Sequence, residues 1–182
     1  MSDELTTEFL SENELEIFSE LGHDKRKNEF LSGRKLFRDM VDEIGWNYST
    51  IDTDRDELGK PSGYLDGNEI QLSYTHSNQL MLCACSLNRP IGIDIEDVYR
   101  EIKPDLVNRL ANEDEKELLP VLQLWTVKEA ALKMKGIGIR MDLKSLKVVQ
   151  NQNHLEVLFS DDSMCEFCTF EHQNHFITLA FT

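Results

Sequence analysis

The sequence predicts an α+β protein built from two similar lobes, and two observations lead to this fold class. Stretches with helical periodicity and short alternating stretches follow one another in mixed order, which indicates helices packed on antiparallel strands. The segment THSNQLMLCACS (75–86) also resembles EHQNHFITLAFT (171–182) at an offset of 96 residues. Near the same offset, the helical stretch 29–41 falls opposite 124–136, so each half would run from a helix into strands.

A duplication would divide the chain into an N-terminal lobe over 1–88 and a C-terminal lobe over 89–182. The two lobes would be related by a pseudo-twofold axis, and the cleft between them would be the natural ligand site. Chance similarity is the alternative explanation of the repeat, because only three of the twelve paired positions are identical.

The elements follow from periodicity and turn residues. Helices are expected where apolar residues recur every three to four positions, and strands where apolar and polar residues alternate between turn signals. The segment GKPSGYLDGN (59–68) is expected to be a turn-rich loop, because Gly and Pro punctuate it. The expected helices span 12–21, 24–45, 104–119 and 122–135. The expected strands span 48–53, 70–75, 79–87, 91–96, 145–150, 154–159 and 164–181, the last as two strands or one bent strand.

Composition excludes several classes of protein. A formal charge of −15 argues against a nucleic-acid surface, which needs a basic face. The longest apolar run, Leu80 to Cys85, is far shorter than the roughly 20 residues of a membrane helix. The acidic start MSDELTTEF lacks the features of a signal peptide, so a cytoplasmic protein is expected. The four cysteines are expected to be thiols, because neither close pair has the surroundings of a zinc site.

The basic residues are concentrated. Twelve of the 19 lie within 25–38 and 128–147 of this acidic chain. This distribution fits a small polyanionic ligand held between two segments better than a long polyanion spread along one face.

The stretch RPIGIDIEDV (89–98) alternates isoleucines with carboxylates. As a strand it would place Asp94 and Glu96 on one face and the isoleucines on the other. Two acids so close together repel each other unless water surrounds them or a cation lies between them. A solvated strand edge and half of a cation site are both consistent with this stretch alone.

The helix LQLWTVKEAALKMKG (122–136) offers a third acid. Trp125, Lys128, Glu129, Leu132 and Lys133 follow helical spacing and share a face. An exposed Glu129–Lys133 pair is the simpler explanation of the helix alone. Together with the strand, however, three carboxylates and nearby lysines suit Mg²⁺ bridging a pyrophosphate, as in phosphoryl-type transfer.

Two further segments carry polar groups at turns. LSYTHS (72–77) ends an expected strand with Thr75 and His76, which are either turn residues or donors to a phosphate. Lys60 of GKP lies in a loop that can fold over the same place, although taken alone it is an ordinary solvated lysine.

The series GKP, THS, IGIDIEDV and LWTVKEAALK resembles the signature series of the Sfp-type 4′-phosphopantetheinyl transferases, in the right order over about residues 23–148. The resemblance implies a monomeric, Mg²⁺-dependent enzyme of two similar lobes with its active site between them. Such enzymes transfer the phosphopantetheine arm of coenzyme A to a serine of an apo acyl or peptidyl carrier protein and release 3′,5′-ADP. Neither nucleic acid nor membrane is an expected partner.

The resemblance also implies roles for individual residues. Asp94, Glu96 and Glu129 match the metal ligands, and Glu129 also matches the base that deprotonates the carrier serine. Lys133 matches the lysine that assists the departing 3′,5′-ADP, with Lys128 beside it in the motif. The residues matching coenzyme A contacts, or the arginine common in the first-lobe helix, are Arg34, Lys60, Thr75 and His76.

The sequence departs from the family pattern in three places, of which THS in place of Ser-His-Ser keeps the hydroxyl. Residues 1–22 contain no base, so the adenosine 3′-phosphate would fall to Arg26, Lys27 and Arg34. The expected docking helix DLVNRLANEDEKELL (105–119) is acidic, which predicts a carrier with an apolar or basic docking surface. These departures keep open a non-catalytic coenzyme A- or carrier-binding module, and a phosphohydrolase using the same acids is a third reading.

Overall fold

The computed structural model describes residues 6–138, 142–152 and 154–182, and it confirms the α+β class. Within these residues the strands form two antiparallel sheets, ordered β1-β2-β3-β4 and β5-β9-β8-β7-β6. The first sheet contains β1 (Ile51–Arg55), β2 (Pro61–Leu65), β3 (Asn68–His76) and β4 (Met81–Ser86). The second contains β5 (Ile91–Asp97), β6 (Lys147–Asn151), β7 (His154–Leu158), β8 (Met164–His172) and β9 (His175–Phe181).

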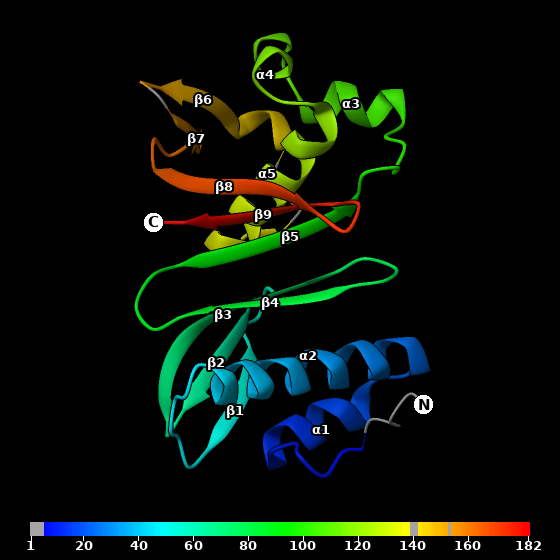
Figure 1. Cartoon of the computed structure of the whole chain (residues 1–182), viewed down its shortest axis with the longest axis vertical. Helices are drawn as coiled ribbons and strands as arrows, with labels where there is room; N and C mark the ends of the chain where they lie inside the picture. Colours follow the sequence, from blue (N-terminus) through cyan, green and yellow to red (C-terminus); the bar gives the residue numbers. More distant parts are fainter. Residues whose placement is uncertain (1–5, 139–141, 153) are drawn as a thin grey trace.

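The helices lie on the outer sides of this arrangement. In Figure 1, α1 and α2 lie beside the first sheet, α5 crosses the second sheet, and α3 and α4 lie near the far end of the molecule. The bounds are α1 (Glu12–Glu20), α2 (Asp24–Glu43), α3 (Pro104–Leu110), α4 (Glu113–Leu118) and α5 (Val121–Lys135), with a 3₁₀ turn, η2 (Leu143–Ser145). The C-terminal end of α5 is marked by Gly136, whose left-handed φ of 76° suits glycine.

Two of the expected elements need correction. The segment 59–68 is not a loop, because β2 occupies Pro61–Leu65 and joins β3 through Asp66 and Gly67. Both turn residues have positive φ, 49° and 78°, and Asp-Gly is a strong signal for a two-residue hairpin turn. The proline stands at the first position of the strand, where a missing N–H is tolerated.

The expected helix 104–119 is two helices, because Ala111 leaves the helical region and Asn112 starts α4 with a capping box to Glu115. The segment 164–181 forms two strands, the first of the two expected alternatives, with β8 and β9 joined at Gln173 and Asn174.

The element order supports the internal repeat. At an offset of 96 residues, β3 falls on β8 and β1 on β6 with identical bounds, while α2 falls on α5 and β4 on β9 within a few residues. Each half therefore contains one long helix and a matching set of strands, as a duplication would produce. The boundary between residues 88 and 89 stays a prediction, and it lies in the connection between β4 and β5.

Strand β5 has two different faces. Ile91, Ile93 and Ile95 pack in one apolar cluster with Ala84 of β4 and Ile177 of β9, so this face joins the first sheet to the second. The opposite face points toward α5, because a Cβ atom on Gly92 would overlap backbone atoms of that helix. The isoleucine face therefore packs between the two halves, and the face that carries the acids is directed to α5.

The close approach of β5 and α5 requires glycine at position 92. A Cβ atom on Gly92 would overlap the carbonyl oxygen of Ala130 and the backbone nitrogen of Met134. We expect Gly92→Ala to lower the free energy of unfolding by about 1–3 kcal/mol or more, because backbone must move on both sides. Urea unfolding measures this, with Gly22→Ala as the control because a Cβ there has no neighbour within 4 Å. Equal stability of Gly92→Ala and the wild type would contradict this packing.

Candidate active site

The end of β3, the acidic face of β5 and one face of α5 enclose a cleft of about 380 Å³. The cleft brings together six of the predicted catalytic, metal and coenzyme A residues, whereas Lys128, Arg34 and Lys60 do not line it. Its lining residues are Tyr74, Thr75, His76, Asp94, Ile95, Glu96, Trp125, Glu129 and Lys133.

Asp94 is buried in the cleft and half paired. Its Oδ1 accepts hydrogen bonds from Lys133 Nζ at 2.6 Å and from Thr75 Oγ1 at 3.2 Å. Its Oδ2 is buried without a hydrogen-bond partner. Burial raises the pKa of Asp94, and the charge of Lys133 opposes that rise. One oxygen of this carboxylate is therefore available to a ligand that enters the cleft.

Glu129 lies one turn before Lys133 on α5 and is only 6% exposed. Its Oε1 is also buried without a partner. Burial, helped by the negative charge of Asp94, raises the pKa of Glu129 to about 7. A carboxylate with a pKa near neutrality is suited to accept a proton at physiological pH.

Glu96 is engaged differently from the other two acids. Its Oε1 accepts a hydrogen bond from Trp125 Nε1 at 3.0 Å and pairs with Arg100. The Arg100 guanidinium lies over the Trp125 ring, 5.0 Å from the centroid. Burial raises the pKa of Glu96, with the charge of Arg100 acting in the opposite direction.

The residues fit a divalent cation in part. Among the described residues, no group of three or more His, Cys, Asp or Glu side chains is arranged to hold a metal ion. Asp94 Oδ2 and Glu129 Oε1, however, are two buried oxygens without partners in one cleft. Mg²⁺ is commonly held by one or two carboxylates, with water and phosphate completing its shell. The metal roles of Asp94 and Glu129 stay predictions that the cleft can accommodate, and so does that of Glu96, whose Oε1 is engaged by Arg100 and Trp125.

The position of Lys128 differs from the expectation that it works beside Glu129. Its Nζ is fully buried, 2.7 Å from Glu115 Oε1, and donates to the carbonyl oxygens of Leu110 and Leu143. Consecutive helix residues point about 100° apart, so Lys128 lies outside the cleft while Glu129 lines it. Lys128 therefore has a structural position, where its ion pair with Glu115 links α5 to α4.

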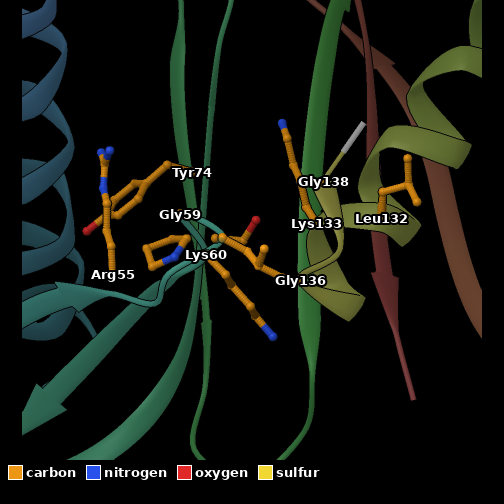
Figure 2. A pocket seen from close by; sticks show the side chains of 11 residues that line it. Arg55, Gly59, Lys60, Tyr74, Leu132, Lys133, Gly136 and Gly138 are labelled. Atoms are coloured by element: carbon orange, nitrogen blue, oxygen red, sulfur yellow. The ribbon is translucent and has the colours of Figure 1, made fainter. Parts of the chain in front are cut away.

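Lys60 lies over the end of α5. Its Nζ donates to the carbonyl oxygen of Met134 at 2.8 Å and to Gln71 Oε1 at 3.1 Å. It lines a second cavity of about 250 Å³ together with Lys133 and Arg55. Figure 2 shows these side chains around the cavity, with Arg55 beside Tyr74. Burial lowers the pKa of Lys60.

Arg34 is buried and stacks on Phe30, with its guanidinium carbon 3.9 Å from the ring centroid. Its Nε and one terminal nitrogen, Nη2, have no hydrogen-bond partner. It lines a third cavity, of about 410 Å³, with Arg26, Arg55 and His76. Lys27 instead lies over the Phe18 ring.

Sequence reasoning missed Arg55 and Arg100. Arg55 stands in the acidic stretch DTDRDE and gave no pattern. Arg100 follows Glu96 by four residues, and the turn after β5 brings it back onto that carboxylate. The sequence signal for this pair is the spacing of four residues between Glu96, on the acidic face of the strand, and Arg100.

The raised pKa of Glu129 predicts a pH effect on stability. Its folded-state pKa of about 7 exceeds the ordinary value of 4.5, so the folded protein binds more protons between these values. The stabilisation is fully present below pH 4.5 and is lost as the pH rises through 7. Without divalent cations, we expect the contribution of Glu129 to make the free energy of unfolding, measured in urea, up to about 3 kcal/mol lower at pH 8 than at pH 5. Glu129→Gln should remove that part of the slope, and an identical slope in both proteins would contradict it.

The comparisons with known proteins identify the class. A model of the 4′-phosphopantetheinyl transferase superfamily matches residues 90–180, half of the chain. The chain therefore belongs to this superfamily. The curated relatives associate it with the Sfp-type members, as the motifs implied.

Three relatives show the extent of the similarity. The chain is 31% identical over 108 residues to the 4′-phosphopantetheinyl transferase gsp of Aneurinibacillus migulanus, covering 54% of this chain and 44% of that protein. It is 27% identical over 175 residues to the 4′-phosphopantetheinyl transferase Sfp of Bacillus subtilis, covering 90% and 77%. It is 26% identical over 146 residues to the 4′-phosphopantetheinyl transferase HetI of a Nostoc species, covering 71% and 61%. For two of these three relatives, the matched segment spans less than two thirds of the relative's own length.

The helices carry no sign of a membrane span. None of those in the described part of the chain combines the length and the apolar character needed to cross a bilayer.

Proposed function

We propose that this protein transfers the 4′-phosphopantetheine arm of coenzyme A to a serine of an apo acyl or peptidyl carrier protein, with Mg²⁺, and releases 3′,5′-ADP. One observation carries the proposal: Glu129 and Asp94 each keep a buried oxygen without a partner in a cleft that also contains Lys133. We expect the protein to act as a monomer in the cytoplasm.

The residues of the cleft suit each part of this transfer. Glu129 accepts the proton of the carrier serine, because its pKa of about 7 leaves much of it ionised yet basic near neutrality. The serine oxygen then forms a bond to the phosphorus nearer the pantetheine, and the bond from that phosphorus to the oxygen of 3′,5′-ADP breaks. Lys133 neutralises the charge that develops on the departing phosphate. A bound Mg²⁺ would draw charge from the pyrophosphate oxygens, with Asp94 and Glu129 as its nearest candidate ligands.

The two neighbouring cavities suit the rest of coenzyme A. Lys60 and Lys133 line one cavity, and Arg26 and Arg34 line the other. Arg55 lines both cavities. Three arginines line one cavity, and the buried Arg34 among them has two nitrogens without a hydrogen-bond partner, although its Nε lies 4.0 Å from Glu14 Oε1. Such a cluster suits a phosphate group. This cluster offers the basic groups that residues 1–22 lack, and we assign it to the adenosine 3′-phosphate.

The transfer itself is tested directly. Purified protein is incubated with coenzyme A, Mg²⁺ and several apo-carrier proteins of differing surface charge, and mass spectrometry detects the added arm. Addition of the arm to a carrier serine supports the proposal, with an apo-carrier whose serine is replaced by alanine as the control. If the protein binds coenzyme A but adds the arm to none of the carriers, the proposed transferase activity is wrong.

A specific observation favours a second candidate, the non-catalytic coenzyme A- or carrier-binding module. Glu96 is held by Arg100 and Trp125, so the three expected metal ligands are not assembled in the described residues. Binding of coenzyme A without transfer would support that function. Release of 3′,5′-ADP in the absence of any carrier would instead indicate a phosphohydrolase.

A further inference from the structure

Arg100 lies just beyond the end of β5, with a side chain that is 39% exposed. Its guanidinium pairs with the Glu96 carboxylate and stacks over the Trp125 ring. Trp125 Nε1 donates a hydrogen bond to the same carboxylate oxygen, Glu96 Oε1. Two groups of the protein therefore contact one oxygen, Oε1, of the carboxylate that the sequence assigned to a metal.

The cavities show on which side Arg100 acts. Glu96 and His76 line both the cleft that contains Glu129 and a neighbouring cavity of about 470 Å³. Arg100 and Tyr99 line only this neighbouring cavity. Arg100 therefore contacts Glu96 from the neighbouring cavity, whereas Asp94 and Glu129 line the cleft.

The two other acids have no comparable restraint on their free oxygens. Asp94 Oδ2 and Glu129 Oε1 have no partner, although Lys133 holds the other oxygen of Asp94. The counter-ions of Asp94 and Glu96, Lys133 and Arg100, are both partly exposed, but Lys133 stands on α5 whereas Arg100 comes from a segment outside strand and helix. Movement of the Arg100 side chain would leave the hydrogen bond from Trp125 Nε1 as the remaining contact on Glu96 Oε1.

We propose that Arg100 is a positioning residue that holds Glu96 Oε1, so that Arg100 and a divalent cation compete for the Glu96 carboxylate. The inference rests on the proposed function, because the cation is the one that the transfer would use. Two cations that compete for one carboxylate weaken each other's binding by the same factor. The guanidinium also repels a cation that approaches Glu96. Arg100 therefore lowers the metal affinity of the protein before coenzyme A adds its phosphate oxygens.

Metal binding without coenzyme A tests this inference. Titration of Mg²⁺, and of Mn²⁺ as a second probe, is followed by calorimetry and by the emission of Trp125 in a Trp46→Phe background, since the chain contains two tryptophans. We expect Arg100→Gln to tighten metal binding about tenfold, within the range of typical coupling between two sites. Arg100→Lys, which keeps the charge, should restore most of the wild-type affinity. Lys103→Gln removes an exposed charge from the same loop and should leave the affinity within about twofold.

Further variants show whether the effect passes through Glu96. Glu96→Gln should weaken metal binding and abolish the metal-dependent change in Trp125 emission, and Arg100→Gln should add nothing in that background. Unchanged or weaker metal binding by Arg100→Gln would overturn the inference, as would equal gains from Arg100→Gln and Lys103→Gln. Unchanged metal binding by Glu96→Gln would also overturn it. The proposed function is decided separately, by transfer of the arm in the wild-type protein.

Discussion

Glu129→Gln lowers the rate of phosphopantetheine transfer by about 10²–10⁴-fold, the usual contribution of a positioned general base. The amide has nearly the same shape as the carboxylate but cannot take the proton of the carrier serine. It also removes the negative charge of one of the two acids with an unpartnered oxygen, which weakens metal binding at the same time. The rate is measured at saturating coenzyme A by mass spectrometry of the carrier.

The control for this variant is Glu166→Gln, which neutralises an exposed acid on β8 and should transfer at the wild-type rate. The fold of Glu129→Gln is checked by its unfolding in urea at pH 8, where it should be at least as stable as the wild type. Full activity of a folded Glu129→Gln would show that another group takes the proton. Loss of activity only at low metal concentration would assign the residue to the metal alone.

Lys128→Ala has the largest expected effect on stability. The Lys128–Glu115 pair is fully enclosed, with exposed side-chain fractions of 0% and 1%, and removal of the lysine leaves Glu115 buried without its counter-ion. Breaking a buried pair in this way costs about 3–5 kcal/mol. We expect a loss of that size in the free energy of unfolding, measured in urea.

The chain provides a matched control. Lys116 and Glu113 form a pair at the same distance, 2.7 Å, in the same region, but Glu113 is 91% exposed. Lys116→Ala should cost less than about 1 kcal/mol. The double variant Lys128→Met with Glu115→Gln should be more stable than Lys128→Met, because the glutamine oxygen can still accept from Val148 N and no charge is left unpaired. A fully stable Lys128→Ala that lost transfer would return Lys128 to the catalytic role that the sequence suggested.

Much of the site could be predicted from the sequence, because the periodicity of a strand or helix determines which side chains share a face. Alternation in β5 separated Asp94 and Glu96 from the isoleucines, and the spacing of four residues placed Glu129 and Lys133 on one face of α5. Those rules depend only on local geometry, which the sequence specifies well.

The remaining features depend on partners far along the chain. Lys128 stands at the edge of the same helix face, and only the buried position of Glu115 draws it away from the cleft. Arg55 and Arg100 became recognisable when the fold placed them beside Tyr74 and Glu96. The sequence does not predict strand β2, because Gly and Pro are loop signals, although Asp66-Gly67 marks the hairpin turn itself.

The two faces of β5 determine how this protein can be divided. A cut between residues 88 and 89 would leave Ile91, Ile93 and Ile95 uncovered on the C-terminal fragment and would separate Thr75 from Asp94. Neither fragment would hold a complete site, but each would carry the apolar surface that the other needs. Coexpressed halves should therefore reassemble through this surface, which makes the protein a natural candidate for a split reporter whose activity depends on bringing the two fragments together.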